Sequence, residues 1–156
     1  MKKLLLVLVL IAIITTGTAF ASSFAIGVHG GFGGIGGGAG VNFVVSNLFF
    51  YVDALGFGEN HMVVSGACDF VHLLNNEFVK TLSFYIRVGV GASFWGSGDN
   101  LGLAASVRLP IGLSWRPISL IEVFLQVVPQ LGLRVLPDVA LWGNYWGGNI
   151  GIRLWF

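Results

Sequence analysis

Residues 82–95 read LSFYIRVGVGASFW, and residues 101–116 read LGLAASVRLPIGLSWR. In the first stretch every even position is apolar, whereas the odd positions carry Ser, Tyr, Arg, Gly or Trp. In the second stretch every odd position is apolar, and the even positions carry Gly, Ala, Ser, Arg or Pro. Successive side chains of a β-strand point to opposite faces, so a period of two indicates a strand with two unlike faces. Two long strands are therefore predicted, and they decide the fold class.

Weaker alternation extends along the rest of the chain. It predicts eight strands, near residues 24–32, 39–45, 48–54, 62–72, 82–95, 101–116, 119–127 and 149–156. The connections between them are then residues 33–38, 46–47, 58–61, 74–79, 96–100, 116–118 and 136–138. The strand over 62–72 is the least regular because both of its faces are apolar, and only Ser65 and Asp69 select its inward face.

The composition favours lipid as the surroundings of these strands. The chain has 156 residues, 55% hydrophobic and 10% charged, whereas about a quarter of a soluble protein is charged. After residue 21 no run of 18 apolar residues occurs, so spanning helices are disfavoured. A backbone in lipid can otherwise satisfy its hydrogen bonds only in a closed barrel. The predicted fold is all-β, a single eight-stranded antiparallel up-and-down transmembrane β-barrel. A soluble lipocalin-like barrel has the same geometry and stays open as an alternative.

The N-terminus predicts export from the cytoplasm. Two lysines precede an unbroken apolar run over residues 4–14, and the segment after it ends in Ala19 and Ala21, one residue apart. This is the order of a secretory signal peptide, so residues 1–21 are expected to be cleaved and residues 22–156 to form the barrel. The remaining chain has six basic and seven acidic residues, a net charge near −1. No basic patch is left for a nucleic acid.

Charged residues on the predicted strands share the inward parity. The expected polar network of the lumen consists of Asp53, Asp69, Arg87, Arg108, Glu122, Gln126 and Arg153. An arginine turned to the bilayer midplane costs about 2 to 4 kcal/mol, which fixes the register. An eight-stranded barrel is just wide enough for side chains to fill, so these groups should pair, with help from Tyr51 and Tyr85. The network is interpreted as a structural plug or, alternatively, as a gate for a narrow path of water or small ions.

Aromatic residues are expected near the two membrane interfaces. An even number of strands places both chain ends on one side, the periplasmic side in outer-membrane barrels. The periplasmic rim would hold Phe50, Phe70, Phe78, Trp115 and Phe156. The outer rim would hold Phe32, Phe57, Phe94, Trp142 and Trp146.

The last eight residues, 149–156, read NIGIRLWF and are similar to the C-terminal signal of bacterial outer-membrane proteins. Ile150, Ile152, Leu154 and Phe156 match its alternating hydrophobic residues and terminal Phe. The resemblance implies that the barrel-assembly machinery recognises this strand. The chain also resembles small eight-stranded barrels such as the transmembrane domain of outer-membrane protein A. The stretches RLPIGLSWRP, FLQVVPQLGL and GIRLWF look like a family of spirochaetal outer-membrane barrels of unknown function.

Other motifs give weak signals. Residues 31–36 fit G-x-G-x-x-G, but more glycines follow where a dinucleotide site needs a helix, so a turn is favoured and no cofactor is expected. The three histidines lack the spacing of metal ligands. His61 with Ser65 is the nearest approach to a lipid-modifying enzyme, and it lacks a third orienting group. Cys68 is expected to face lipid.

The sequence therefore predicts a non-enzymatic, monomeric protein of the bacterial outer membrane with a structural or surface-interaction role. A narrow pore and a lipid-modifying enzyme are the two alternatives. The expected partners are outer-membrane lipid, the assembly machinery and an unidentified extracellular ligand.

Overall fold

The computed structural model describes residues 24–33, 36–58, 61–97 and 100–156, and every element in them is a β-strand. The strands are β1 (Phe24–Gly33), β2 (Gly36–Val45), β3 (Leu48–Gly58), β4 (His61–Val79), β5 (Leu82–Ser97), β6 (Asn100–Arg108), β7 (Ile111–Ile118), β8 (Ile121–Leu136) and β9 (Ala140–Trp155). The expected signal peptide, with Ala19 and Ala21, lies outside the described residues. In the described ranges, no helix has the length and apolarity needed to cross a membrane.

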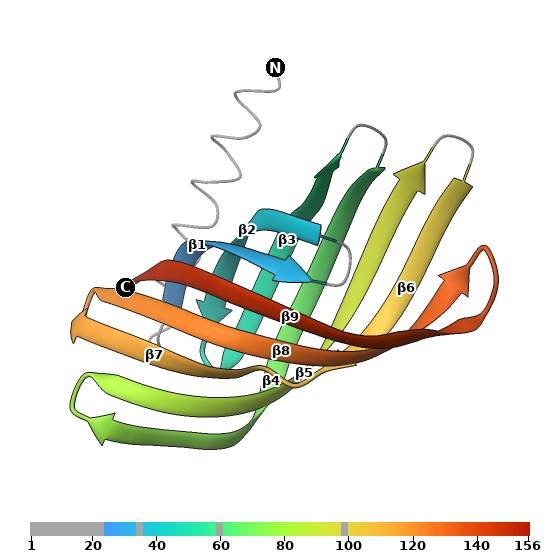
Figure 1. The fold of residues 1–156 in the computed structure, drawn as a ribbon. Helices are drawn as coiled ribbons and strands as arrows, with labels where there is room; N and C mark the ends of the chain where they lie inside the picture. Colours follow the sequence, from blue (N-terminus) through green and yellow to red (C-terminus); the bar gives the residue numbers. More distant parts are fainter. Residues whose placement is uncertain (1–23, 34–35, 59–60, 98–99) are drawn as a thin grey trace.

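The strands form a closed ring. Neighbouring strands pair in an antiparallel manner around the whole sheet, and the pairing of β1 with β9 joins its two ends (Figure 1). The short strands β6 and β7 share one position between β5 and β8. The nine strands therefore occupy eight positions. The fold is an all-β, antiparallel, up-and-down barrel with a ring of eight strands, as the alternation predicts.

One interruption separates β6 from β7. The sequence predicts a single strand over residues 101–116, and the structure divides it at Leu109 and Pro110. Proline has no N–H to donate to the neighbouring strand. The ladder nevertheless continues around it, because the carbonyl of Pro110 accepts a hydrogen bond from the Arg87 amide and Leu109 donates to the Pro129 carbonyl, both at 2.9 Å. The division therefore reflects one missing donor within a continuous strand.

The β4–β5 hairpin is longer than predicted. Residues 74–79 were expected to connect two strands, but they extend β4, which pairs with β5 as far as Val79 opposite Leu82 (Figure 1). The turn is formed by residues 80–81. The register of β4 shifts at three places, between residues 69 and 79, and such bulges change the side-chain parity. The alternation therefore holds as far as Asp69, with Val63 and Asp69 buried and Val64 exposed, and it is lost beyond Asp69.

The other turns are close to their predicted positions. Residues 46–47 form the predicted two-residue turn, in which Ser46 has φ of 59°, as tight hairpins require. The turn predicted at 116–118 lies instead at residues 119–120, because Ile118 pairs with Ile121. Part of the predicted loop over 33–38 also belongs to β2, since the ladder between β1 and β2 continues through glycine to Gly36.

The two faces of the barrel are chemically opposite. Adjacent residues alternate between exposed and buried along several strands, as in the pairs Val28 and His29, Val41 and Asn42, Val52 and Tyr51, Val107 and Arg108, and Ile152 and Arg153. In each pair the exposed residue is apolar and the buried residue can form hydrogen bonds. The surface is apolar outside and polar inside, the reverse of a soluble protein.

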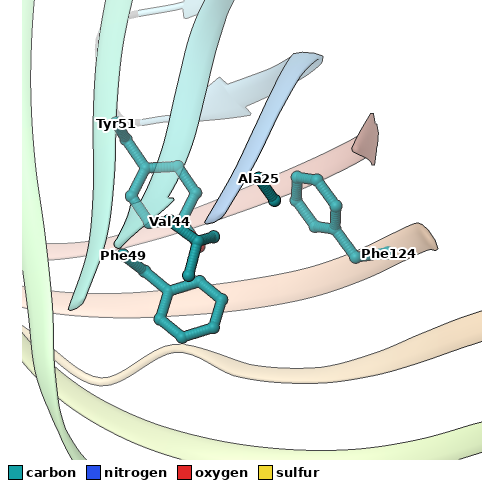
Figure 2. Close-up of a cluster of buried hydrophobic side chains, with 5 residues drawn as sticks. All are labelled: Ala25, Val44, Phe49, Tyr51 and Phe124. Atoms are coloured by element: carbon teal, nitrogen blue, oxygen red, sulfur yellow. The ribbon is translucent and has the colours of Figure 1, made fainter. Parts of the chain in front are cut away.

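The lumen also contains an apolar cluster. Figure 2 shows its five members, which approach one another from β1, β2, β3 and β8: Ala25, Val44, Phe49, Tyr51 and Phe124. Ala67 and Trp155 pack against the cluster. Its aromatic rings lie beside the charged groups of the lumen, so the interior is packed with both kinds of side chain.

Inward glycines make room for the large lumenal side chains. Five glycines lie directly opposite a large inward residue on the neighbouring strand: Gly27 opposite Arg153, Gly40 opposite Asp53, Gly89 opposite Asp69, Gly112 opposite Tyr85 and Gly151 opposite Phe124. A Cβ atom on Gly27 would lie 2.8 Å from the Cγ of Arg153, and one on Gly112 would lie 2.6 Å from the Oη of Tyr85. Both separations are too short for non-bonded atoms, so these positions require glycine.

Candidate functional site

The centre of the lumen is an ion pair between Arg153 on β9 and Glu122 on β8, which lie opposite each other in register. The Nη1 of Arg153 donates to the Oε1 of Glu122 at 3.0 Å. Its Nε donates to the Oδ1 of Asn42 on β2 at 2.6 Å, and its Nη2 to the Oη of Tyr51 on β3 at 3.0 Å. Each nitrogen of the guanidinium thus has an acceptor, which offsets the cost of burying the charge. This one side chain connects three other strands.

Glu122 accepts further hydrogen bonds. Ser114 on β7 donates to its Oε1 at 2.7 Å, and the indole Nε1 of Trp155 donates to its Oε2 at 2.6 Å. Arg116 reaches the same Oε2 at 3.5 Å. Ser114, Arg116 and Trp155 are not among the predicted network residues. The inward parity of Ser114 and Arg116 was visible in the sequence, but their common acceptor depends on the register of three strands.

Gln126 connects opposite walls of the barrel. Its Oε1 accepts a hydrogen bond from the Oη of Tyr85 on β5 at 2.9 Å and lies 3.5 Å from the Oη of Tyr51 on β3. In the ring, β3 and β8 are separated by β4, β5 and the shared position of β6 and β7, so they stand on opposite sides. Side chains therefore meet across the lumen at this level.

A second branch joins the network through Asn42. Because Arg153 can only donate, it must face the Oδ1 of Asn42, which leaves the amide nitrogen to donate to the Nδ1 of His29 at 3.1 Å. The other ring nitrogen of His29, Nε2, then carries the hydrogen that faces the Oδ1 of Asp53. Ser65 donates to the second oxygen of Asp53 at 3.5 Å. His29 and Asn42 are not among the predicted network residues.

This branch has the three residue types of a hydrolytic triad in a different order. The carboxylate of Asp53 lies between His29 and Ser65, whereas in a triad the imidazole contacts the hydroxyl and takes its proton. The contacts of Asp53 therefore fix side chains in place and do not activate the Ser65 hydroxyl. The side chain of His61, the other residue considered with Ser65, lies outside the described residues.

Asp69 and Arg108 form a separate ion pair on the other side of the lumen. The Nε of Arg108 lies 2.9 Å from the Oδ1 of Asp69, and both side chains are buried. The two atoms are close without the alignment of a hydrogen bond, and the Oδ2 of Asp69 also has no hydrogen-bond partner. The guanidinium of Arg108 lies 4.8 Å from the centre of the Tyr51 ring. This pair is held by charge and ring contacts more than by hydrogen bonds.

Arg87 lies in the lumen but apart from the carboxylates. Among the described residues, none of its nitrogens has a carboxylate oxygen within 4.0 Å. Its guanidinium carbon lies 3.5 Å from the ring centre of Phe49 and 3.8 Å from that of Tyr85. Its Nε and Nη1 are buried and have no hydrogen-bond acceptor within the described ranges. The structure thus joins Glu122, Gln126, Arg153 and, through His29, Asp53, and it leaves Arg87 outside this group.

The remaining candidate residues have simpler positions. Ile150, Ile152, Leu154 and Phe156 are all exposed, and the Phe156 amide donates to the Phe24 carbonyl at 2.8 Å beside the seam between β1 and β9. The glycine motif over 31–36 spans the end of β1 and the start of β2, a hairpin and not a strand followed by a helix. Within the described part of the chain, no three His, Cys, Asp or Glu side chains gather as metal ligands.

Comparison with solved structures finds barrels that are only distantly similar to this chain. No protein-family model and no curated protein matches the chain. A crystal structure of Neisserial surface protein A aligns with a TM-score of 0.48 and 11% identity, covering 86% of this chain and 96% of the other. Ail, the attachment invasion locus protein of Yersinia pestis, aligns with a TM-score of 0.42 and 15% identity over 86% of this chain and 97% of the other. A designed transmembrane β-barrel gives 0.42 and 16% over 86% and 96%.

These likenesses are too distant to carry information about function. The class of the protein follows from its own strand pairing: an up-and-down barrel with eight strand positions, an apolar outer face and a hydrogen-bonded polar lumen.

Proposed function

We propose that the protein is an integral barrel of the bacterial outer membrane, with a lumen filled by side chains and a structural or surface-interaction role. The observation that carries the proposal is the reversal of the two faces around a closed ring of strands. A closed ring leaves no unpaired strand edge, which is the condition for strands to cross lipid. The apolar residues of every strand are then available to contact acyl chains.

The extent of the apolar outer face supports a lipid partner. Soluble monomers rarely expose a continuous apolar patch of more than a few hundred Å². Here large apolar side chains are exposed on all nine strands, among them Val28, Val41, Val52, Val64, Val90, Val107, Leu113, Leu125 and Ile152. A soluble lipocalin-like barrel would need polar groups at these positions, so the same observation disfavours that alternative.

The contacts inside the barrel support a plug. Arg153 binds groups on three other strands, and Gln126 lies between tyrosines on β3 and β5. Opening the lumen at this level would separate several charge-assisted hydrogen bonds at once, each worth about 1.5 to 3 kcal/mol. A closed, rigid lumen suits a protein that acts through its presence in the membrane or through its outer surface.

The route to the membrane is part of the same proposal. Cleavage of residues 1–21 after Ala21 would release the barrel into the periplasm, and the assembly machinery would recognise the exposed residues from Ile150 to Phe156. Membership of the small spirochaetal family rests on the sequence stretches of the last third of the chain. The protein is proposed to act as a monomer, because ring closure leaves no strand edge open for a second copy.

Two measurements test this proposal. The barrel folded in detergent should migrate differently on a denaturing gel when boiled and unboiled, and the exported protein should fractionate with outer membranes at the size expected after cleavage. Identical migration together with recovery in the soluble periplasmic fraction would contradict the proposal. The Phe156→Ala variant should lower assembly in cells, while refolding in detergent stays normal, because only assembly requires recognition of the C-terminus.

A narrow pore is the second candidate. The observation that favours it is a polar cavity of about 460 Å³ whose wall includes Arg87, Arg116 and Glu122, so that water-accessible space extends to the ion pair in the lumen. Exchange of the Glu122 contacts between Arg153 and Arg116 could then open a path. Planar bilayers with the wild type and with Glu122→Ala distinguish the two functions, since a plug predicts no conductance above the lipid background for either protein.

A further inference from the structure

The polar cavity lies at the end of the barrel that holds the C-terminus. Its wall includes the turns at 46–47 and 80–81, parts of β4, β5 and β7, and Trp155 near the end of β9. The amide of Arg116 donates to the carbonyl of Thr81 at 2.7 Å, which fixes the position of the 80–81 turn beside β7. The cavity has a volume of about 460 Å³, enough for a small solute with its hydration water.

Arg87 is the unusual residue of this cavity. Its side chain is only 5% exposed, yet no described residue accepts a hydrogen bond from its Nε or Nη1. Contacts with the rings of Phe49 and Tyr85 stabilise the charge through their π-faces but do not accept the in-plane N–H groups. Burying a guanidinium without acceptors destabilises the folded state. Most other charged groups of the lumen avoid this cost because they form ion pairs.

Three lumenal carboxylates each contact another side chain. Asp69 lies 2.9 Å from Arg108, and Glu122 contacts Arg153, Ser114, Arg116 and Trp155. Asp53 contacts His29 and Ser65. Among the described residues Arg87 thus lines the cavity without a carboxylate partner, and a molecule in the cavity can supply one to its guanidinium.

The charges of the cavity wall favour a negative ligand. Arg87, Arg116 and Lys80 carry positive charges. Against these stand the carboxylates of Glu77 and Glu122, and Glu122 is neutralised by its ion pair with Arg153. The hydroxyls of Ser46, Thr81 and Ser83 also line the cavity and can donate to an oxygen.

We propose that this cavity binds a small oxyanion, a carboxylate or phosphate group, with Arg87 as its main ligand and Arg116 and Lys80 at its entrance. A guanidinium presents paired N–H donors that match two oxygens of such a group. The site goes beyond a structural role for the barrel, because it gives the lumen a ligand. In the proposed orientation it opens to the periplasm, so the ligand is a periplasmic solute or the headgroup of an inner-leaflet lipid.

Nuclear magnetic resonance of the folded barrel tests the site directly. The protein is prepared in octyl glucoside micelles, which contain no phosphate, and the arginine Nε–Hε signals are followed during titration with sodium phosphate at constant ionic strength. The Arg87 signal should shift and saturate, whereas sodium chloride should not reproduce the shift. The Arg87→Gln variant should weaken phosphate binding by roughly tenfold or more, because it loses one charge-assisted bidentate contact.

Arg134→Gln is the matched control, since Arg134 lies at the distant end of β8 and donates to the carbonyl of Asp138. It should bind phosphate as the wild type does. If Arg87→Gln does not fold, Lys80→Gln and Arg116→Gln should each weaken binding several-fold in a barrel with normal heat-modifiable migration.

Titrations with acetate and with short-chain phosphatidylglycerol identify the source of the ligand. Saturation by the small ions indicates a free solute, and saturation by the lipid alone indicates a headgroup. A shift that chloride reproduces, or unchanged binding by Arg87→Gln, would overturn the proposal.

Discussion

Arg153 and Arg87 lie in the same lumen and are buried in opposite ways. Arg153 is fully buried, and its three nitrogens donate to Glu122, Asn42 and Tyr51. Arg87 is 5% exposed, and its neighbours are two aromatic rings and a polar cavity. The first arginine connects strands, whereas the second is held against aromatic rings, and its Nε and Nη1 have no acceptor among the described residues. The comparison shows that one barrel contains both a structural charge and a charge available to a ligand.

The difference has a simple origin in the strand register. Arg153 lies opposite Glu122 on β8 and opposite Gly27 on β1, so it has an acceptor on one side and space on the other. The ladder places Arg87 opposite His72 on β4, and the next strand position holds Pro110. No carboxylate lies directly opposite Arg87, and Asp69, which lies further along β4 opposite Gly89, pairs with Arg108, so the aromatic rings are the packing partners of Arg87.

Removal of the Arg153 side chain should cause the largest loss in the free energy of unfolding. Arg153→Ala leaves the buried Glu122 without its ion pair, and we expect a loss of about 3 to 5 kcal/mol in the free energy of unfolding. The measurement is a urea titration of the barrel in phospholipid vesicles, followed by the heat-modifiable band. The double variant Arg153→Met with Glu122→Leu should recover much of this loss, because it removes both charges. A loss below about 1 kcal/mol for Arg153→Ala would show that the pair is not structural.

An arginine introduced on the outer face should lower the free energy of unfolding by nearly as much. Val107 is 57% exposed and precedes the lumenal Arg108. Val107→Arg therefore adds a second arginine to the same strand, on its lipid-facing side. We expect a cost of about 2 to 4 kcal/mol near the bilayer midplane. Val139→Arg is the control, because Val139 is 80% exposed in the connection between β8 and β9. Equal effects of the two substitutions would contradict the lipid-facing placement of Val107.

Space for Arg153 can be removed without changing the arginine. A Cβ atom in Gly27→Ala would lie 2.8 Å from the Cγ of Arg153 and would clash with the Ile152 carbonyl, so we expect a loss of about 1 to 3 kcal/mol. Gly30→Ala on the same strand is the matched control, since its Cβ would come no closer than 3.7 Å to any other atom. The two unfolding curves should differ clearly. If they coincide, the strand relaxes at Gly27 and the glycine is not required for packing.

Much of the fold follows from local sequence, because parity is a local property. Glu122 and Arg153 lie inside because their apolar neighbours must lie outside, and this reasoning needs no knowledge of the partner strands. It holds across Pro110 and along β4 as far as Asp69, and it fails only beyond Asp69, where three register shifts exchange the faces. Bulges depend on the strain of ring closure, which a single strand does not reveal.

The partners within the lumen could not be predicted in this way. Arg153 and Tyr51 are 102 residues apart in the chain, and their contact depends on the stagger of the whole ring. The inward parity of His29 and Asn42 was visible, but their link to Arg153 and Asp53 was not. The separation of Arg87 from the carboxylates was hidden for the same reason, since all inward charges look equivalent before the strands are placed in register.

The two tyrosines beside these arginines give the finest comparison. Tyr51→Phe removes the acceptor of the Arg153 Nη2, a hydrogen bond to a charged group, and we expect a loss of about 1.5 to 3 kcal/mol. Tyr85→Phe removes only the neutral bond to Gln126 and keeps the ring against Arg87, so about 0.5 to 1.5 kcal/mol should be lost. Unfolding in urea measures both losses. The opposite order of stability would mean that the ring contacts, and not the hydrogen bonds of Arg153, hold the lumen together.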